Sequence, residues 1–205
     1  MAVNLSTANG HNCWMDPSLG LRERKKIKTR NAIRREAYRL IDAQGYGNTT
    51  VEQIADAADV STSTFFRYFP SKESVLVADD LIEAVIDAFT TAPAELPPIA
   101  AYRHALSEMF GAMTPAEREE AITGQRLMYS IPEARGLLYG EYMRCMALIV
   151  EALQVRLQEP TSEFHRRIMA GAIVGVLMAA SDGTPLPDDP LQEALTCLET
   201  LMPLR

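Results

Sequence analysis

The chain has 205 residues, of which 47% are hydrophobic and 23% charged, and its formal net charge is −7. Such a balance is typical of a globular protein of one large or two small domains. It contains no apolar run long enough to cross a bilayer and no basic, apolar start typical of a secretory signal, so we expect a cytoplasmic protein with no membrane partner.

Residues 1–20 are polar and predict a flexible tail, in which Trp14 packs loosely. Residues 17–72 carry eleven Lys and Arg against six Asp and Glu, a net charge of +5, so the remainder carries −12. A basic N-terminal third joined to an acidic remainder suggests two surfaces, one of them for a polyanion. A solvated basic helix would show the same charge.

The first predicted helix lies within residues 26–45. Its apolar residues recur at helical spacing: Ile33, Ala37, Leu40 and Ile41. Lys26, Arg30 and Arg34 are four residues apart and predict a basic stripe on another face. Gly45 and Gly47 then end the helix.

Two short helices are predicted next, over residues 51–58 and 62–69. Thr49 or Thr50 can cap the first and Ser61 the second. Asp59 stands in the turn between them, where glycine is common, and aspartate tolerates the positive φ that such a turn needs. A helix, a short helix, a tight turn and another short helix form a helix-turn-helix, whose last helix fits the major groove of DNA.

The segment DVSTSTFFRYFPSKE, residues 59–73, combines aromatic rings, hydroxyls and one arginine. A helix this short needs large side chains to hold it. Phe65 and Phe69 are therefore expected to face inward, toward Ile33, Val51 and Ile54. Hydroxyls, arginine and an aromatic ring on the opposite side can contact bases or phosphates. An aromatic packing helix explains the phenylalanines but not the hydroxyls and arginine together.

The stretch TTVEQIADAADVSTSTFFRYFPSKESVL resembles the DNA-binding signature of TetR-type transcriptional regulators. The resemblance implies an all-helical homodimer, usually a repressor, that a small ligand releases from double-stranded operator DNA. It also implies roles for matching residues. The base contacts implied are Thr62, Ser63, Phe66 and Arg67, and the phosphate contacts implied are Thr50, Thr64, Tyr68 and Lys72.

The rest of the chain is also helical in pattern. The predicted helices cover residues 75–90, 99–113, 114–130, 132–158, 161–181 and 189–202, so about nine helices are expected in an all-α fold. Proline-containing breaks separate most of them. We therefore divide the chain into a tail (1–20), a helix-turn-helix domain (21–70) and a helical ligand-binding and dimerisation domain (71–205).

The last two helices predict a dimer interface. Gly171, Gly175 and Ala179 recur every four residues and permit close approach of helices, while Leu195 and Leu198 belong to an apolar stripe on the final helix. Both faces would equally serve to fill the core of a single chain. The family resemblance favours an isologous interface.

The middle helices combine methionines, tyrosines and two arginines. Flexible thioethers and amphipathic rings suit an adaptable apolar cavity, although the same residues are often plain core. The expected pocket residues are Tyr102, Met109, Met113, Arg126, Tyr129, Tyr142 and Met146. Arg126 or Arg144 is suited to an anionic group, with surface ion pairing as the alternative. EREEAITGQRLMYSIPEARGLLYGEY resembles mycofactocin-type regulators, which implies a hydrophobic or acyl-CoA-like effector.

Cysteines and histidines are few and scattered: Cys13, Cys145, Cys197, His11, His104 and His165. Their spacing fits neither a disulfide framework nor a zinc site, and no catalytic signature is present. We expect no catalytic residue, metal or cofactor, and a ligand-responsive repressor of a palindromic operator. The alternatives are an activator, an architectural DNA-binding protein without effector, and an enzyme coupled to a DNA-binding domain.

Overall fold

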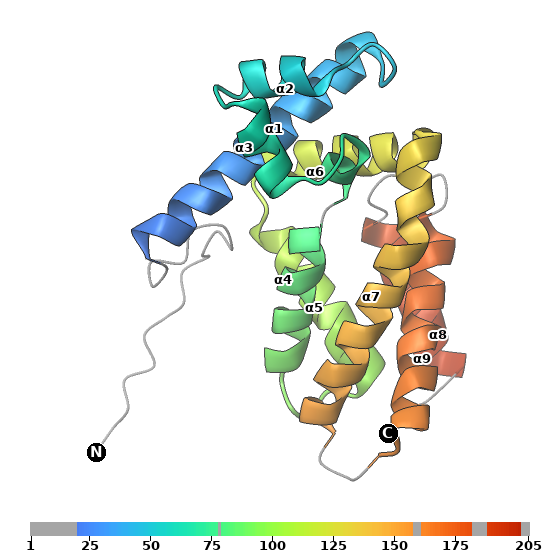
Figure 1. The fold of residues 1–205 in the computed structure, drawn as a ribbon. Helices are drawn as coiled ribbons and strands as arrows, with labels where there is room; N and C mark the ends of the chain where they lie inside the picture. The colour runs from blue at the N-terminus through green and yellow to red at the C-terminus, as the bar shows by residue number, and fades with distance from the viewer. Residues whose placement is uncertain (1–19, 78, 158–160, 182–187, 202–205) are drawn as a thin grey trace.

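The computed structural model describes residues 20–77, 79–157, 161–181 and 188–201. Within these residues the chain is helical and has no strand (Figure 1). This confirms the all-α prediction and the nine α-helices expected from the sequence. The elements are α1 (Leu21–Gln44), α2 (Val51–Ala57), α3 (Thr62–Tyr68), the 3₁₀-helix η1 (Glu73–Leu76), α4 (Asp79–Thr91), α5 (Pro98–Ala112), α6 (Pro115–Ser130), α7 (Pro132–Arg156), α8 (Glu163–Ser181) and α9 (Asp188–Leu201). The predicted tail with Trp14, His11 and Cys13 lies outside the described residues.

Local caps fix the helix-turn-helix. The Thr50 side chain accepts from the backbone N–H of Gln53 at 3.2 Å, and the Gln53 side chain accepts from the backbone N–H of Thr50 at 3.0 Å, a reciprocal capping box. Asp59 has a φ of 54°, and the N–H of Val60 then donates to the carbonyl of Ala55, which ends α2. Ser61 caps α3 through the N–H of Thr64. The expected positive φ at Asp59 and the cap at Ser61 are confirmed.

The N-terminal domain, α1 to α3, is built around a cluster that we call the head core. Phe65 and Phe69 are 0% and 1% exposed and lie in it, as predicted. The head core also takes residues from α6 and the start of α7. It comprises Ile33, Ala37, Tyr38, Ile41, Ile54, Ala55, Phe65, Phe69, Val75, Leu76, Leu127, Ile131 and Ala134.

The predicted helix over residues 75–90 is wrong in one respect, because η1 and α4 are separate elements. Val77 between them is extended, with φ −84° and ψ 122°. Its carbonyl accepts from the guanidinium of Arg34 at 3.2 Å. Arg34 itself is 6% exposed, so the predicted basic stripe of α1 turns inward at this end. Arg30 lies over the Phe69 ring, with 5.0 Å between its Cζ and the ring centroid.

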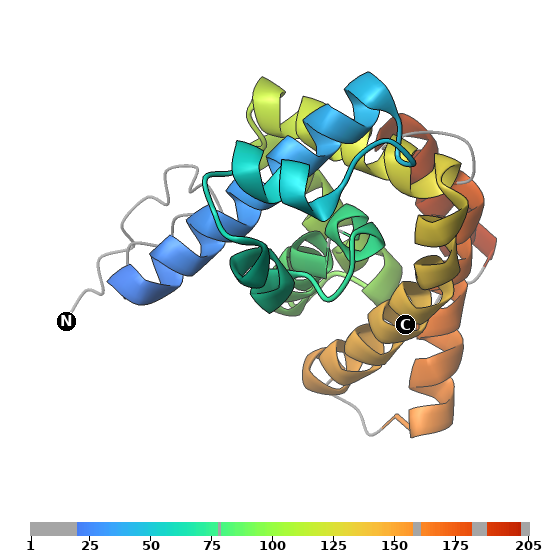
Figure 2. The same ribbon diagram turned by 45° about the horizontal axis from the view of Figure 1, so that its top comes forward.

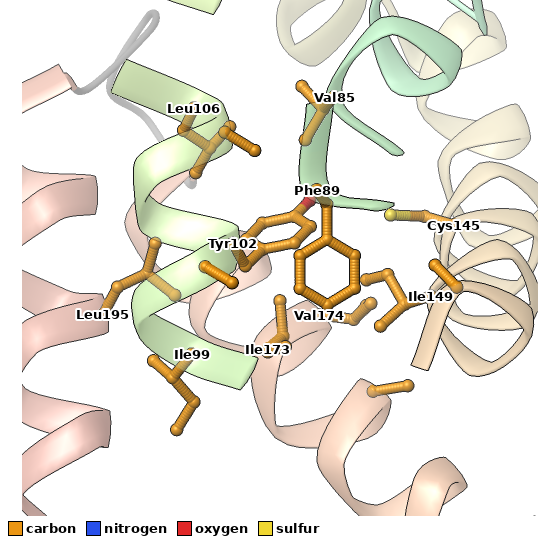
Figure 3. Packing of buried hydrophobic residues seen from close by; sticks show 14 of the residues in the cluster. Val85, Phe89, Ile99, Tyr102, Leu106, Cys145, Ile149, Ile173, Val174 and Leu195 are labelled. Carbon is orange, nitrogen blue, oxygen red and sulfur yellow. The ribbon is translucent and has the colours of Figure 1, made fainter. Parts of the chain in front are cut away.

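The body, α4 to α9, has a second cluster, the body core, at the centre of which Phe89 and Tyr102 pack edge to face with ring centroids 5.5 Å apart (Figure 3). Arg156 fastens the end of α4 to α7, because its guanidinium donates to the carbonyls of Phe89 and Ala92, each at 2.8 Å. The body core comprises Val85, Phe89, Ala92, Ile99, Ala101, Tyr102, Ala105, Leu106, Phe110, Cys145, Ile149, Ala152, Leu153, Met169, Ala170, Ile173, Val174, Leu191 and Leu195.

The N-terminal domain sits at one end of the body, with α1 against α6 and η1 against α7 (Figures 1 and 2). Gly124 of α6 is buried against Tyr38 of α1. The α1–α6 contact thus lies within the head core, and the position of the helix-turn-helix relative to the body depends on it and on the contact of η1 with α7. Among the described residues, no helix is long and apolar enough to cross a membrane.

Candidate DNA-binding surface and effector cavity

The outer face of α3 carries the predicted base contacts. Thr62, Ser63, Phe66 and Arg67 are all exposed, and Phe66 keeps 53% of its surface open although its ring meets Phe65 edge to face. An exposed ring of this size on a short helix offers apolar contact to a partner. The buried Phe65 on the opposite side holds the helix in place, so the face is presented on a rigid support.

Hydroxyl groups are linked at the start of α3. The Ser61 hydroxyl lies 2.9 Å from that of Ser63 and 3.0 Å from that of Thr64. Hydroxyls both donate and accept, so this row can contact phosphate oxygens or base edges. Tyr68 is half-buried at the other end of α3, where the Arg67 guanidinium lies 5.4 Å from its ring centroid. Thr50, which caps α2, is exposed.

Lys72 has a structural role that sequence reasoning missed. Its Nζ donates to the carbonyls of Tyr46 and Thr49, each at 2.8 Å, and lies 3.8 Å from the centroid of the Tyr46 ring. The Tyr46 hydroxyl donates to Glu73 at 3.1 Å. Residues 72 and 73 thus hold the loop between α1 and α2. A lysine has three N–H donors, so these two bonds leave one for a phosphate.

Burial and the neighbouring Glu73 carboxylate raise the pKa of the Tyr46 phenol to about 12, with burial as the larger cause. The pKa of Glu73 is lowered, chiefly by a backbone hydrogen bond and then by the hydroxyls of Ser71 and Tyr46. At neutral pH the Tyr46 phenol is therefore neutral, and it contacts both the Glu73 carboxylate and the Lys72 side chain. In the sequence, the only sign of this cluster is Tyr46 between two glycines, together with the Lys72-Glu73 pair much later in the chain.

A cavity of about 450 Å³ lies between the N-terminal domain and the body. Of the predicted pocket residues, those that line it are Tyr102, Met109, Met113, Tyr129 and Tyr142. The hydroxyls of Tyr129 and Tyr142 are 2.5 Å apart. Ligand sites of small molecules are commonly ~300–1,000 Å³ and mostly apolar, so this cavity has the size and lining of such a site.

Two predicted pocket residues do not line the cavity. Arg126 is on the surface, where its guanidinium binds the Asp42 carboxylate at 2.8 Å. Met146 packs against the body core instead. Arg144, the other arginine considered, pairs with Glu83 at 2.6 Å. Both arginines therefore form surface ion pairs, which was the alternative expected from the sequence. Each arginine has a carboxylate within reach on a neighbouring helix.

The cavity also has a wall that sequence reasoning missed, made by α1 of the N-terminal domain. Asn31, Arg34, Arg35 and Tyr38 line it. Carboxylates from α6 and α7 line it as well, namely Glu117, Glu120 and Glu141. The polar groups of the cavity thus include both signs of charge. Helical periodicity gave no signal for this wall, because it placed Arg34 in a basic stripe on another face than the apolar one and did not show what covers that stripe.

Cys145 and Tyr102 lie together where the cavity meets the body core (Figure 3). Burial raises the pKa of the Cys145 thiol to about 11, although the hydrogen bond with Tyr102 lowers it in part. Burial likewise raises the pKa of the Tyr102 phenol. Both groups are neutral at physiological pH, so this end of the cavity suits an uncharged part of a ligand.

The residues predicted for the dimer interface fall into two groups. Gly175 and Ala179 are exposed on α8, and Gly171 is half-buried. Leu195 is 0% exposed and packs within the body core of the single chain (Figure 3), so its assignment to the interface was wrong. Leu198 is half-buried and packs against the same core. The exposed face of α8 also carries Phe164, Ile168 and Met178, which are 69%, 49% and 44% exposed.

A helix-turn-helix with an exposed, polar third helix, mounted on a helical body that holds a cavity, defines a class of ligand-binding DNA regulators. Residues 33–78 match the family described as bacterial regulatory proteins, tetR family, and residues 96–202 match the MftR C-terminal domain. The second match covers more than half of the chain. This chain belongs to the TetR family of transcriptional regulators, with a C-terminal domain of MftR type.

Two curated relatives support this assignment. The HTH-type transcriptional regulator TcmR of Streptomyces glaucescens is 40% identical over 131 residues, which are 61% of this chain and 57% of TcmR. The HTH-type transcriptional regulator EthR of Mycolicibacterium smegmatis is 30% identical over 120 residues, which are 57% of this chain and 55% of EthR. The matches thus span a little over half the length of each relative.

Solved structures show the same fold at low sequence identity. A complex of SmeT with triclosan has a TM-score of 0.58 and 16% identity, and the match covers 85% of this chain and 91% of SmeT. The TetR family repressor AlkX of Dietzia sp. strain DQ12-45-1b, described as implicated in biodegradation of n-alkanes, has a TM-score of 0.54 and 18% identity, with 84% and 94% covered.

Proposed function

We propose that this protein is a dimeric, cytoplasmic repressor that binds a palindromic operator and is released from it by a small hydrophobic or acyl-type effector. The observation that carries the proposal is the cavity of about 450 Å³, whose walls come from both the helix-turn-helix domain and the body. A ligand that prefers one arrangement of the two parts shifts the population toward it. Operator affinity then changes by the same coupling free energy.

The exposed face of α3 supports the assignment of roles in DNA binding. Thr62, Ser63, Phe66 and Arg67 are the proposed base contacts, and Arg67 is suited to a guanine edge. The proposed phosphate contacts are Thr50, Thr64, Tyr68 and Lys72. Alanine at Arg67 should cost about 1–3 kcal/mol on the operator and much less on random DNA. Equal losses on both DNAs would remove Arg67 from the base contacts.

The exposed apolar face of α8 supports dimerisation through α8 and α9. A Cβ added at Gly171 or Gly175 would meet no atom of the same chain within 4 Å, so neither glycine is needed for packing inside the chain. Gly175→Leu should therefore leave the fold intact and separate the protomers, with loss of operator affinity because two half-sites no longer bind as a unit. Gly136→Leu, on an open face of α7, is the matched control in sedimentation. An intact Gly175→Leu dimer would place the interface elsewhere.

The effector should be mostly apolar. Its apolar part would lie against Tyr102, Leu106 and Met109, and its polar end would face Arg35 on α1. Burial of the apolar part contributes roughly 25 cal/mol per Å² before the costs of ordering. Arg126 binds Asp42 instead, so an anionic end, such as that of an acyl compound, would have to use the arginines of α1.

A release assay tests the proposal directly. Fluorescence anisotropy of a labelled palindromic DNA from upstream of the gene would be followed with fatty acids, acyl-CoAs and neutral hydrophobic compounds. We expect at least one class to release the protein. If acyl compounds are active, Arg35→Ala should weaken their effect, while Arg39→Ala, an exposed arginine paired with the same Glu36, should not. No release by any compound would leave an architectural DNA-binding protein.

A further inference from the structure

Tyr38 lies where the cavity, the helix-turn-helix domain and α6 meet. Its side chain is 5% exposed, belongs to the head core and lines the cavity. Because Tyr38 is part of α1, one wall of the cavity is a helix of the DNA-binding domain itself. An occupant of the cavity that reaches this wall touches the DNA-binding domain directly.

The Tyr38 ring packs directly against Gly124 of α6, where the absence of a side chain leaves room for it. A Cβ at position 124 would stand 2.5 Å from the Cε2, Cζ and hydroxyl oxygen of Tyr38. Carbon atoms in contact are normally about 3.5–4 Å apart, so the ring already occupies the space of a side chain on α6. The outer half of the ring is held between α6 and the cavity. A displacement of the ring away from Gly124 would therefore take it into the cavity or carry α1 with it.

We propose that Tyr38 is the residue through which the effector acts on the DNA-binding domain. A ligand in the cavity prevents the Tyr38 ring from moving into the cavity. Because Gly124 blocks the ring on the other side, the ligand then displaces α1 relative to α6. This inference rests on the proposed function and specifies its regulation. It also divides ligands into two kinds. Molecules that reach the Tyr38 wall release DNA, and molecules that fill only the end near Tyr102 bind without release, because they contact both arrangements equally.

The first test needs no effector, since a side chain can serve as the occupant. Ala121 lines the cavity from α6, one turn before Gly124. Ala121→Phe should lower the operator affinity of the effector-free protein at least tenfold. Ala147→Phe, on an exposed face of α7, is the matched control and should leave the affinity unchanged. Circular dichroism and sedimentation would check that both variants fold and assemble as the wild type does.

A second substitution in the same chain makes the test specific for Tyr38. Tyr38→Leu keeps an apolar side chain in the head core but removes the outer ring atoms and the hydroxyl that lie against Gly124. The variant with both Ala121→Phe and Tyr38→Leu should regain operator affinity to within threefold of Tyr38→Leu alone. Wild-type operator affinity in Ala121→Phe, or no recovery in the double variant, would overturn the proposal.

Gly124→Ala gives an independent readout if Ala121→Phe does not fold. The added methyl should push the Tyr38 ring into the cavity and weaken binding of N-phenyl-1-naphthylamine, a neutral apolar dye, at least tenfold. Gly136→Ala controls for the change in helix propensity, and Tyr38→Leu should restore dye binding in the Gly124→Ala chain. Unchanged dye affinity in Gly124→Ala would count against the steric contact on which the proposal depends.

The proposal and the proposed function fail in different ways. If compounds release the wild type and Tyr38→Leu from the operator at equal concentrations, the proposed function is supported and the proposed role of Tyr38 is refuted. If no compound releases the wild type and the dye does not bind it, the cavity is not a ligand site. The operator affinities of the Ala121→Phe chains then decide by themselves whether Tyr38 couples the cavity to the DNA-binding domain.

Discussion

Lys72→Met should destabilise the protein as well as weaken DNA binding. The substitution keeps the apolar stem and removes the ammonium that bonds the carbonyls of Tyr46 and Thr49 at 2.8 Å and lies 3.8 Å from the Tyr46 ring centroid. Thr49 is 1% exposed, so its carbonyl has little access to water in exchange. Loss of two charge-assisted hydrogen bonds and one cation–π contact should cost about 2–4 kcal/mol of unfolding free energy.

Urea denaturation at one fixed protein concentration measures this loss, because the stability of the proposed dimer would depend on concentration. Lys28→Met is the control: it removes one positive charge at an exposed position of α1 and should cost less than ~0.5 kcal/mol. A role limited to phosphate binding predicts a different pattern. Lys72→Met would then be as stable as the control while the salt slope of DNA binding fell by about one unit, and that result would refute the reasoning.

Two further predictions follow from the ionisable groups. Because the pKa of Glu73 is lowered below its ordinary 4.5, its contribution to stability is present above that pH and is lost as pH falls through the folded pKa. The stability difference between the wild type and Glu73→Gln should therefore shrink below pH 4.5 in urea titrations, and a constant difference would contradict the assignment. Iodoacetamide at pH ~8 should modify the exposed Cys197 and spare the buried Cys145, whose thiol pKa is raised to about 11. Peptide mass spectrometry distinguishes the two, and equal rates would mean that the cavity opens to solvent.

The helix-turn-helix was predictable because its signals are local. Thr50 and Ser61 are capping residues directly before short helices, and Asp59 tolerates the positive φ that the turn requires. Phe65 and Phe69 are four residues apart, so their common inward face follows from helical geometry. These signals can be read without residues outside this stretch of the chain, although the packing of Phe65 and Phe69 also uses α1, η1 and α6.

The break at Val77 was not predictable in the same way. The run VLVADDLIEAVI has the periodicity of one continuous helix, yet the Val77 carbonyl accepts from Arg34, 43 residues earlier in the chain. Arg34 was assigned to a basic stripe on another face of α1, and its burial was missed for the same reason, since spacing shows which residues share a face but not what covers that face. The error at Leu195 is similar, because an apolar stripe looks alike whether it meets the body core or a second chain.

The composition of the cavity was partly visible in the sequence. Methionines and tyrosines at helical spacing indicated an adaptable apolar region, and Met109, Met113 and Tyr129 do line it. Arg126 was misplaced because the sequence does not show that Asp42 lies opposite it on α1. Tyr38 also lines the cavity, and its ring packs against Gly124, which is 86 residues later in the chain. Only the fold brings these two residues together.

The head core crosses the predicted domain boundary at residue 70, and this limits how the protein can be re-engineered. A chimera that joined residues 1–70 to the body of another regulator would leave Phe69 and Ile41 without Val75, Leu76 and Leu127. The apolar surface exposed in this way would favour aggregation or misplacement of α3. Exchange of operator specificity should therefore be sought by grafting only the outward residues of α3, with the buried side of α3, α1 and α6 retained from one parent.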